Sequence, residues 1–366
     1  MSVRLVCKYF DSFVSDERWW KSRIEHEADI KLFPISTTAP GFSYARTFSL
    51  LKSEERRWGY WDIKERKSIQ GHTGTVDSVK MFLNDSKPYC LSGSRDGSIR
   101  LWDLELVKQN TDPKVCSRAD LRGAHSGWIW SIDTQKQSNQ FLTGSWDDYI
   151  KLWNIGESEI EELASARGNG AVTSVAYTGE THCAASTYTR KTIILDVKNS
   201  LNVVGEYCFH TGPIFAMEAS GDYVYTAGED NKVIMVDRRQ TNLPVCSRKL
   251  QEGRTQWLSL GPNQLVCGLA KGQVVFLDPK TLLGVGRFNS EMESIRQIKH
   301  TGGSIIAISR RREMRVFKPG MRAGTRAIEG DFENELVRFD YLNGYLVMGD
   351  GSGSVSFWTC PNDCGY

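Results

Sequence analysis

Hydrophobic and polar residues alternate along most of this chain in short runs, and the runs recur at a regular interval. Aligning LSGSRDGSIRLWD (91–103) with LTGSWDDYIKLWN (142–154) places two alternating runs around a short polar segment. Alternation is typical of half-buried strands, and Gly, Asn or Asp between two runs indicates a tight turn. Each unit therefore predicts a β-hairpin. The apolar residues at the last shared position are Trp102, Trp153, Leu195, Val236, Leu277, Phe317 and Trp358.

The spacing of these positions predicts the fold. Successive intervals are 51, 42, 41, 41, 40 and 41 residues, and the first is longer because VKQNTDPKVCSRADL (107–121) inserts a polar, loop-like stretch. Before each hairpin lies another alternating run, such as TVDSVKMF (75–82), and before that a more polar fourth run. Four short strands in about 40 residues, repeated seven times, predict an all-β, seven-bladed β-propeller.

Polar residues also recur at fixed places in some units. They are a His before the second run, a Ser or Thr and an Asp in the hairpin, and the Trp. Two units have the full set: His72, Ser92, Asp96 and Trp102, then His125, Thr143, Asp147 and Trp153. This pattern resembles the WD-repeat family, in which the four side chains form a hydrogen-bonded tetrad. The fourth unit keeps His210, Thr226 and Asp230 but has Val236 at the Trp position, and the remaining units have lost most of the set.

The ring is expected to close by joining the two ends of the repeat region. The segment 64–72 supplies a lone outer strand before the first full unit, and the last unit supplies only three strands. Pairing the two would complete the seventh blade. The propeller is therefore predicted to span residues 64–366.

An eighth blade is the alternative, because Trp61 and Asp62 precede Trp102 in phase with the repeat. The sequence before Trp61 has no pair of alternating runs joined by a turn with Gly or Asp. Instead, it places Phe48, Leu51 and Trp58 on one helical face. This favours a helix at about 43–61, within a linker spanning 26–63, and seven blades.

The chain begins with RLVCKYFDSFVSDERWWKSRI (4–24), an apolar pattern at helical spacing in which Ser15 is expected to cap a new helix. Placed before a WD propeller, this stretch resembles the second half of an F-box, as found in F-box proteins with WD repeats. Residues 1–25 are accordingly predicted to form the C-terminal half of an F-box. The first half, with its Leu-Pro entry and first helix, is expected to be missing from this chain.

The resemblance implies a substrate-recognition subunit of a Skp1–cullin–F-box type ubiquitin ligase. A complete F-box would bind a Skp1-like adaptor, and the upper face of the propeller would bind the protein to be ubiquitinated. The adaptor-binding residues implied are Val6, Cys7, Phe10 and Trp20. The alternative is a WD scaffold that binds other proteins without any attachment to a ligase.

The same resemblance indicates where a partner would bind. In WD propellers the residue before the turn Asp, and residues at the start of the innermost strand, point to the upper rim. The residues in these places are Arg95, Trp146, Tyr188, Glu229, Asp77, Trp128 and Trp130. Aromatic residues with Arg are typical of binding hot spots, although Trp128 and Trp130 are alternatively packing between blades. With Arg95 and Arg310, this surface favours an acidic or phosphorylated peptide.

Composition excludes several other classes. A net charge of +2 and an isolated basic cluster at 310–315 give no support for nucleic-acid binding. Nine scattered cysteines without a CxxC pair indicate reduced thiols in the cytoplasm or nucleus. No apolar run approaches the roughly 18 residues of a membrane span. No catalytic motif or metal-ligand spacing is found, and GDGSGS (349–354) is interpreted as a hairpin turn, so we expect a non-catalytic protein without a cofactor.

Overall fold

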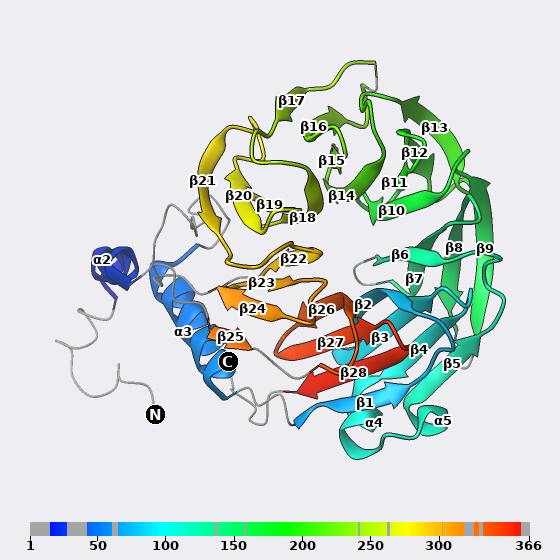
Figure 1. Ribbon diagram of the computed structural model, residues 1–366, viewed down its shortest axis with the longest axis horizontal. Helices are drawn as coiled ribbons and strands as arrows, with labels where there is room; N and C mark the ends of the chain where they lie inside the picture. The colour runs from blue at the N-terminus through cyan, green and yellow to red at the C-terminus, as the bar shows by residue number, and fades with distance from the viewer. Residues whose placement is uncertain are drawn as a thin grey trace.

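The structure is a computed structural model that describes residues 15–27, 42–60, 65–135, 138–156, 159–240, 242–261, 264–301, 303–317, 326–328 and 332–359. In these ranges, 28 strands form seven four-stranded antiparallel sheets arranged as a ring (Figure 1). The prediction of a seven-bladed propeller preceded by helices is confirmed. Three residues of the expected F-box segment, Val6, Cys7 and Phe10, lie outside the described residues.

The blades are numbered along the chain, and each of the first six uses four consecutive strands from the innermost to the outermost. Blades 1 to 3 contain β2 (Val76–Asn84), β3 (Lys87–Ser94), β4 (Ile99–Asp103), β5 (Ser117–Leu121), β6 (Ile129–Thr134), β7 (Gln140–Ser145), β8 (Tyr149–Ile155), β9 (Ile160–Arg167), β10 (Val172–Tyr177), β11 (His182–Thr187), β12 (Thr192–Asp196) and β13 (Asn202–Tyr207). Blades 4 to 6 contain β14 (Ile214–Ser220), β15 (Tyr223–Gly228), β16 (Lys232–Asp237), β17 (Cys246–Lys249), β18 (Thr255–Leu260), β19 (Leu265–Leu269), β20 (Gln273–Leu277), β21 (Gly284–Asn289), β22 (Gln297–His300), β23 (Ile305–Ile308), β24 (Met314–Phe317) and β25 (Arg326–Ile328).

Blade 7 combines the two ends of the repeat region. It contains β26 (Leu336–Leu342), β27 (Tyr345–Asp350), β28 (Ser354–Thr359) and, as its outermost strand, β1 (Lys67–Gln70). β1 runs antiparallel to β28, with Ile69 opposite Val355. This pairing closes the ring, so the strand edges between the first and last blades are not left open to other chains.

The hydrophobic core lies between the blades, because each sheet packs its two faces against its neighbours. The second strands are therefore buried on both faces: all five residues of β19 and seven of the eight residues of β3 are buried. Strands buried on both faces read as nearly continuous apolar runs. This explains why the apolar period persists in units that have lost their polar residues.

The polar insertion in blade 1 differs from the loop expected. It forms two short helices, α4 (Leu104–Gln109) and α5 (Pro113–Cys116), between β4 and β5. The Asp103 carboxylate accepts hydrogen bonds from the first turn of α4, and Asp112 caps α5 in the same way, with Pro113 at its first position. Side-chain caps of this kind satisfy the free N–H groups of a helix start.

Two helices precede the propeller, α2 (Glu17–Glu27) and α3 (Tyr44–Tyr60), and they pack on each other. The ring centroids of Trp20 and Phe48 are 5.3 Å apart. The start of α2 is capped by the carboxylate of Asp16, which accepts a hydrogen bond from the backbone of Arg18, and not by the predicted Ser15. Among the described helices, none has the length and apolar character needed to cross a membrane.

Helix α3 docks on blades 6 and 7 (Figure 1). Trp58 is only 1% exposed, stacks on Tyr341 at 5.3 Å between ring centroids, and donates a hydrogen bond from Nε1 to Ser304 Oγ at 3.1 Å. Tyr341 also donates to the Glu54 carboxylate at 3.0 Å. A Cβ at Gly303 would lie 3.1 Å from Glu54 Cγ, so glycine allows this close approach.

Candidate functional site: the upper face of the propeller

We call the end of the blades that carries the turn between second and third strands the upper face, and the opposite end the lower face. In blade 2 this turn is held by the predicted tetrad. His125 Nε2 lies 2.7 Å from Thr143 Oγ1 and its Nδ1 lies 2.9 Å from Asp147 Oδ2, while Trp153 Nε1 donates to Thr143 Oγ1 at 2.8 Å. These contacts join the connection before β6, strand β7, the β7–β8 turn and strand β8 into one hydrogen-bonded unit.

Blade 1 has the same arrangement with one additional member. Ser92 Oγ is 2.7 Å from His72 Nε2 and accepts from Trp102 Nε1 at 2.8 Å. The Ser98 hydroxyl lies between the other two residues, 2.8 Å from His72 Nδ1 and 2.6 Å from Asp96 Oδ1. His72 Nδ1 and Asp96 Oδ2 are consequently 3.5 Å apart, so this tetrad is bridged by a serine.

Burial would raise the pKa of Asp147, but the hydrogen bond and charge of His125 and two backbone N–H groups lower it well below its ordinary value. In blade 4, where Val236 replaces the Trp, burial lowers the pKa of His210 more than Asp230 raises it. These side chains are saturated with internal hydrogen bonds. They act as braces that fix the turns, not as an acid–base pair.

The residue before each tetrad Asp projects from a fixed turn. In blade 1 it is Arg95, whose Nε donates to Asp77 Oδ2 at 2.7 Å and whose guanidinium carbon lies 4.3 Å from the Trp128 ring centroid. Asp77 was predicted to be a contact residue at the rim, but it is buried. Its carboxylate is engaged by Arg95, so it orients this arginine instead of offering an acceptor at the surface.

Aromatic rings continue from Arg95 across blades 2 and 3. Trp128 and Trp130 stack at 6.4 Å between centroids, Trp146 lies 5.7 and 5.4 Å from them, and Tyr188 lies 5.6 Å from Trp146. Trp128, Trp146 and Tyr188 are 38%, 39% and 48% exposed, while Trp130 is more covered. We call these four rings together with Arg95 the Trp–Arg surface. Exposed aromatic groups of this size beside an arginine are typical of protein-binding surfaces.

Glu229, the corresponding residue of blade 4, belongs to a separate pair. Its carboxylate lies 3.5 Å from Arg254, and the Arg254 guanidinium lies 5.9 Å from the Phe215 ring centroid. Both partners are substantially exposed, so this ion pair is screened by water and contributes little to stability.

Sequence reasoning missed Arg338 and Trp257, which lie beside Trp130 at the mouth of the central channel. The Arg338 guanidinium carbon is 4.6 Å from the Trp257 centroid and 5.8 Å from the Trp130 centroid. The three side chains come from blades 7, 5 and 2, so they meet across the channel. Strand register is the one signal that points to these positions, because Arg338 and Trp257 occupy the place of Ser78 in blade 1. Arg338 lies opposite Gly349, Trp257 opposite Gly268 and Ser78 opposite Gly93.

Further down the channel, charged residues lie on the innermost strands of blades 1, 2, 6 and 7. Lys80 pairs with Asp133 at 2.7 Å and Lys299 pairs with Asp340. Burial raises the pKa of Glu218, which faces the same space, to about 7. The channel cavity has a volume of about 240 Å³. Within the described ranges, no group of His, Cys, Asp or Glu side chains is arranged to hold a metal ion.

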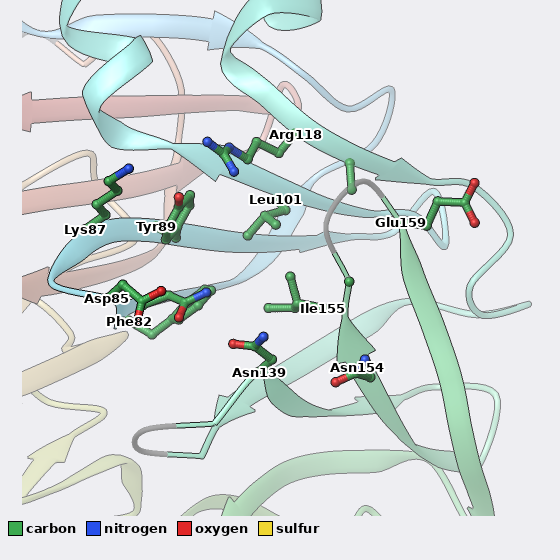
Figure 2. A pocket seen from close by; sticks show the side chains of 13 residues that line it. Phe82, Asp85, Lys87, Tyr89, Leu101, Arg118, Asn139, Asn154, Ile155 and Glu159 are labelled. Atoms are coloured by element: carbon green, nitrogen blue, oxygen red, sulfur yellow. The ribbon is translucent and has the colours of Figure 1, made fainter.

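A second cavity of about 460 Å³ opens between blades 1 and 2 at the lower face (Figure 2). Asp85 and Lys87 flank its rim from the β2–β3 turn, and Arg118 lies 5.4 Å from the Tyr89 centroid. Arg118 also donates to Asp103 at 3.1 Å. The lining is polar, and its Arg118 is engaged by the ion pair with Asp103.

Comparison with known proteins supports the same view of the fold. Residues 63–103 and 117–154 match the family described as WD domain, G-beta repeat. The chain is 28% identical to F-box/WD repeat-containing protein mec-15 of Caenorhabditis elegans, over 97% of this chain and 89% of that protein. It is 25% identical to human F-box/WD repeat-containing protein 9 over 96% of the chain and 76% of that protein, and 24% identical to the Bos taurus protein of that name over 86% and 68%. Over most of its length, the chain is therefore homologous to F-box/WD repeat-containing proteins.

Proposed function

We propose that this protein is the substrate-recognition subunit of a Skp1–cullin–F-box type ubiquitin ligase, with the propeller binding the protein to be ubiquitinated. The observation that carries the proposal is the similarity to F-box/WD repeat-containing proteins, which covers 97% of the chain in the first comparison and so includes the helical N-terminal region. The Trp–Arg surface adds a physical reason, because it offers exposed aromatic area suited to a protein ligand. In this role the chain is a non-catalytic adaptor of the cytoplasm or nucleus.

The attachment of α3 suits such an adaptor. Ser304, which accepts the hydrogen bond of Trp58, lies in the connection between the first and second strands of blade 6. That connection is at the lower face, so α3 is anchored at the opposite end of the blades from the Trp–Arg surface. A ligase that binds this chain through its N-terminal helices would therefore hold a substrate on the opposite side of the propeller, at a fixed distance.

The test uses purified full-length chain with a purified Skp1-like adaptor and, separately, substrate capture in cells followed by ubiquitination. Because the first half of an F-box is expected to be missing from this chain, Skp1 binding is measured on the chain and on a form that carries such a half at its N-terminus. We expect stable Skp1 binding by the extended form, weakened by Trp20→Ala and unaffected by Trp146→Ala. We expect Trp146→Ala to reduce substrate ubiquitination, and Leu243→Ala, a change at an exposed residue of blade 4, to leave both unchanged. Partner binding without any Skp1 binding would overturn the ligase role in favour of a scaffold.

A further inference from the structure

A buried guanidinium without a carboxylate partner lies at the mouth of the central channel. Arg338 is 7% exposed, and its Nη1 donates to the Val337 carbonyl at 3.0 Å, while its Nε has no acceptor among the described residues. A buried charge that lacks an ionic partner is destabilising. Buried polar groups left unsatisfied in a native structure call for an explanation such as a bound ion or ligand. Arg338 lines the channel cavity, so an acceptor can reach it from there.

The surrounding charges do not neutralise Arg338. The carboxylate of Asp77 is engaged by Arg95, and that of Glu335 pairs with Arg296. Burial is the larger cause and repulsion from Arg296 the second, and together they lower the pKa of Arg338 to about 9. Arg95 and Arg296 thus each have a carboxylate partner, whereas Arg338 has none among the described residues and keeps an unpaired positive charge.

We propose that Arg338 binds a single carboxylate of the recognised protein, supplied by an Asp or Glu side chain or by the chain's C-terminus. This inference rests on the proposed function and names the class of segment that the propeller binds. A carboxylate carries one negative charge and matches the single unpaired charge of Arg338. A phosphate monoester carries close to two, and because the cost of removing an ion from water rises with the square of its charge, the buried slot disfavours it.

The neighbouring rings define what accompanies the carboxylate. Trp130 contacts both Arg338 and Trp146, and Trp146 contacts Tyr188. The path from the guanidinium to the exposed rings is on the order of 10 Å, which an extended peptide covers in about three residues. The preferred segment therefore has an apolar or aromatic side chain two to four residues from its carboxylate.

The test measures fluorescence anisotropy of labelled ten-residue peptides with the purified full-length chain. Each peptide carries one Trp and one Glu at a spacing of two, three or four residues in a Gly-Ser background, with both ends blocked. Matched peptides replace Glu by Gln or by phosphoserine, and a last set replaces the Glu by a free C-terminal carboxylate. We expect the best Glu or C-terminal peptide to bind at least tenfold more tightly than its Gln or amidated counterpart, and more tightly than the phosphoserine peptide.

Variants then locate the site. Arg338→Met, which keeps an unbranched side chain of similar length, is expected to abolish the preference for Glu over Gln, whereas Arg118→Met at the lower face is expected to keep it. Trp146→Ala should weaken both peptides alike, because it removes only the apolar contact. Circular dichroism checks that each variant is folded. The comparison of Glu with Gln peptides on the unaltered chain tests the carboxylate preference even if a variant does not fold.

Three results would each overturn the inference: equal binding of the Glu and Gln peptides, tighter binding of the phosphoserine peptide, or a preference that survives Arg338→Met. Skp1 binding is measured on the same preparations. If it is intact while the carboxylate preference is absent, only the carboxylate site is wrong and the proposed function stands.

Discussion

The docking of α3 on the propeller depends largely on one side chain, and its removal is the perturbation that tests the account of the fold most directly. Trp58 buries its whole indole between blades 6 and 7, stacks on Tyr341 and donates to Ser304. Replacing a buried Trp by Ala costs about 3–5 kcal/mol, and the lost hydrogen bond adds about 1 kcal/mol. Most of the stability of a helix in a protein comes from the packing of its apolar face, so α3 depends on this contact.

Amide hydrogen exchange followed by mass spectrometry measures this docking locally. In Trp58→Ala the amides of α3 should exchange about three to four orders of magnitude faster, since about 1.4 kcal/mol corresponds to a factor of ten. Amides of blades 2 and 3, far from α3, should keep their protection. Trp58→Phe retains a ring against Tyr341, so the amides of α3 should show only a small part of this increase in exchange rate.

Leu50→Ala is the matched control, because Leu50 is an exposed apolar residue of the same helix. Its exchange pattern should equal that of the unaltered chain, apart from a small change in helix propensity. If α3 remained as protected in Trp58→Ala as in Leu50→Ala, the indole would not be what holds the helix, and the reasoning from burial would be refuted.

Three other predictions concern the charged and polar groups of the propeller. Glu218 has a folded-state pKa raised from 4.5 to about 7, so unfolding free energy should fall as pH rises through this window, and Glu218→Gln should flatten that slope in urea denaturation at pH 5 to 8. Asp147→Ala removes the acceptor of His125 and of two backbone N–H groups, and should lower the unfolding free energy by about 3 kcal/mol in the same assay, with a smaller loss counting against the tetrad as a brace. Arg95→Ala leaves the Asp77 carboxylate buried and unpaired and should cost about 2–3 kcal/mol, much of which Arg95→Ala combined with Asp77→Asn should restore, as a double-mutant cycle would show.

The sequence predicted the ring of blades well because its strongest signal, the repeat of apolar positions, is required by the packing of the sheets. Sheets buried on both faces need apolar residues at each inward position, so the period survives in blade 5, where Lys271 and Leu277 have replaced the tetrad Asp and Trp. The short helices of the blade 1 insertion were missed although their signals were present: Asp103 and the Asp112–Pro113 step are ordinary helix starts. Their polar composition made the stretch look like a loop.

The residues at the upper face fall into two groups: positions set within one blade can be predicted from sequence, and contacts between blades cannot. Trp146 and Tyr188 follow from their place in a turn, because that place is set by local hydrogen bonds within one blade. The contact of Arg338 with Trp130 and Trp257 joins blades 7, 2 and 5, and it exists only after the ring has closed. No local pattern encodes such a contact, although the register of the innermost strands narrows it to one residue per blade.

Helix α3 packs against two adjoining blades, 6 and 7, that lack the full polar tetrad. Blade 6 has Arg311 at the tetrad Asp position, and blade 7 keeps only the Trp, Trp358, so neither has the polar brace found in blades 1 and 2. Trp58 of α3 joins the buried cluster shared by these two blades, which also includes Tyr341 and Trp358. Apolar burial by the helix thus supplies, at the lower face, stabilisation that polar tetrads supply at the upper face elsewhere. Helix α3 and blades 6 and 7 therefore stabilise each other at this contact. A substitution in the buried cluster on either side should lower the stability of both.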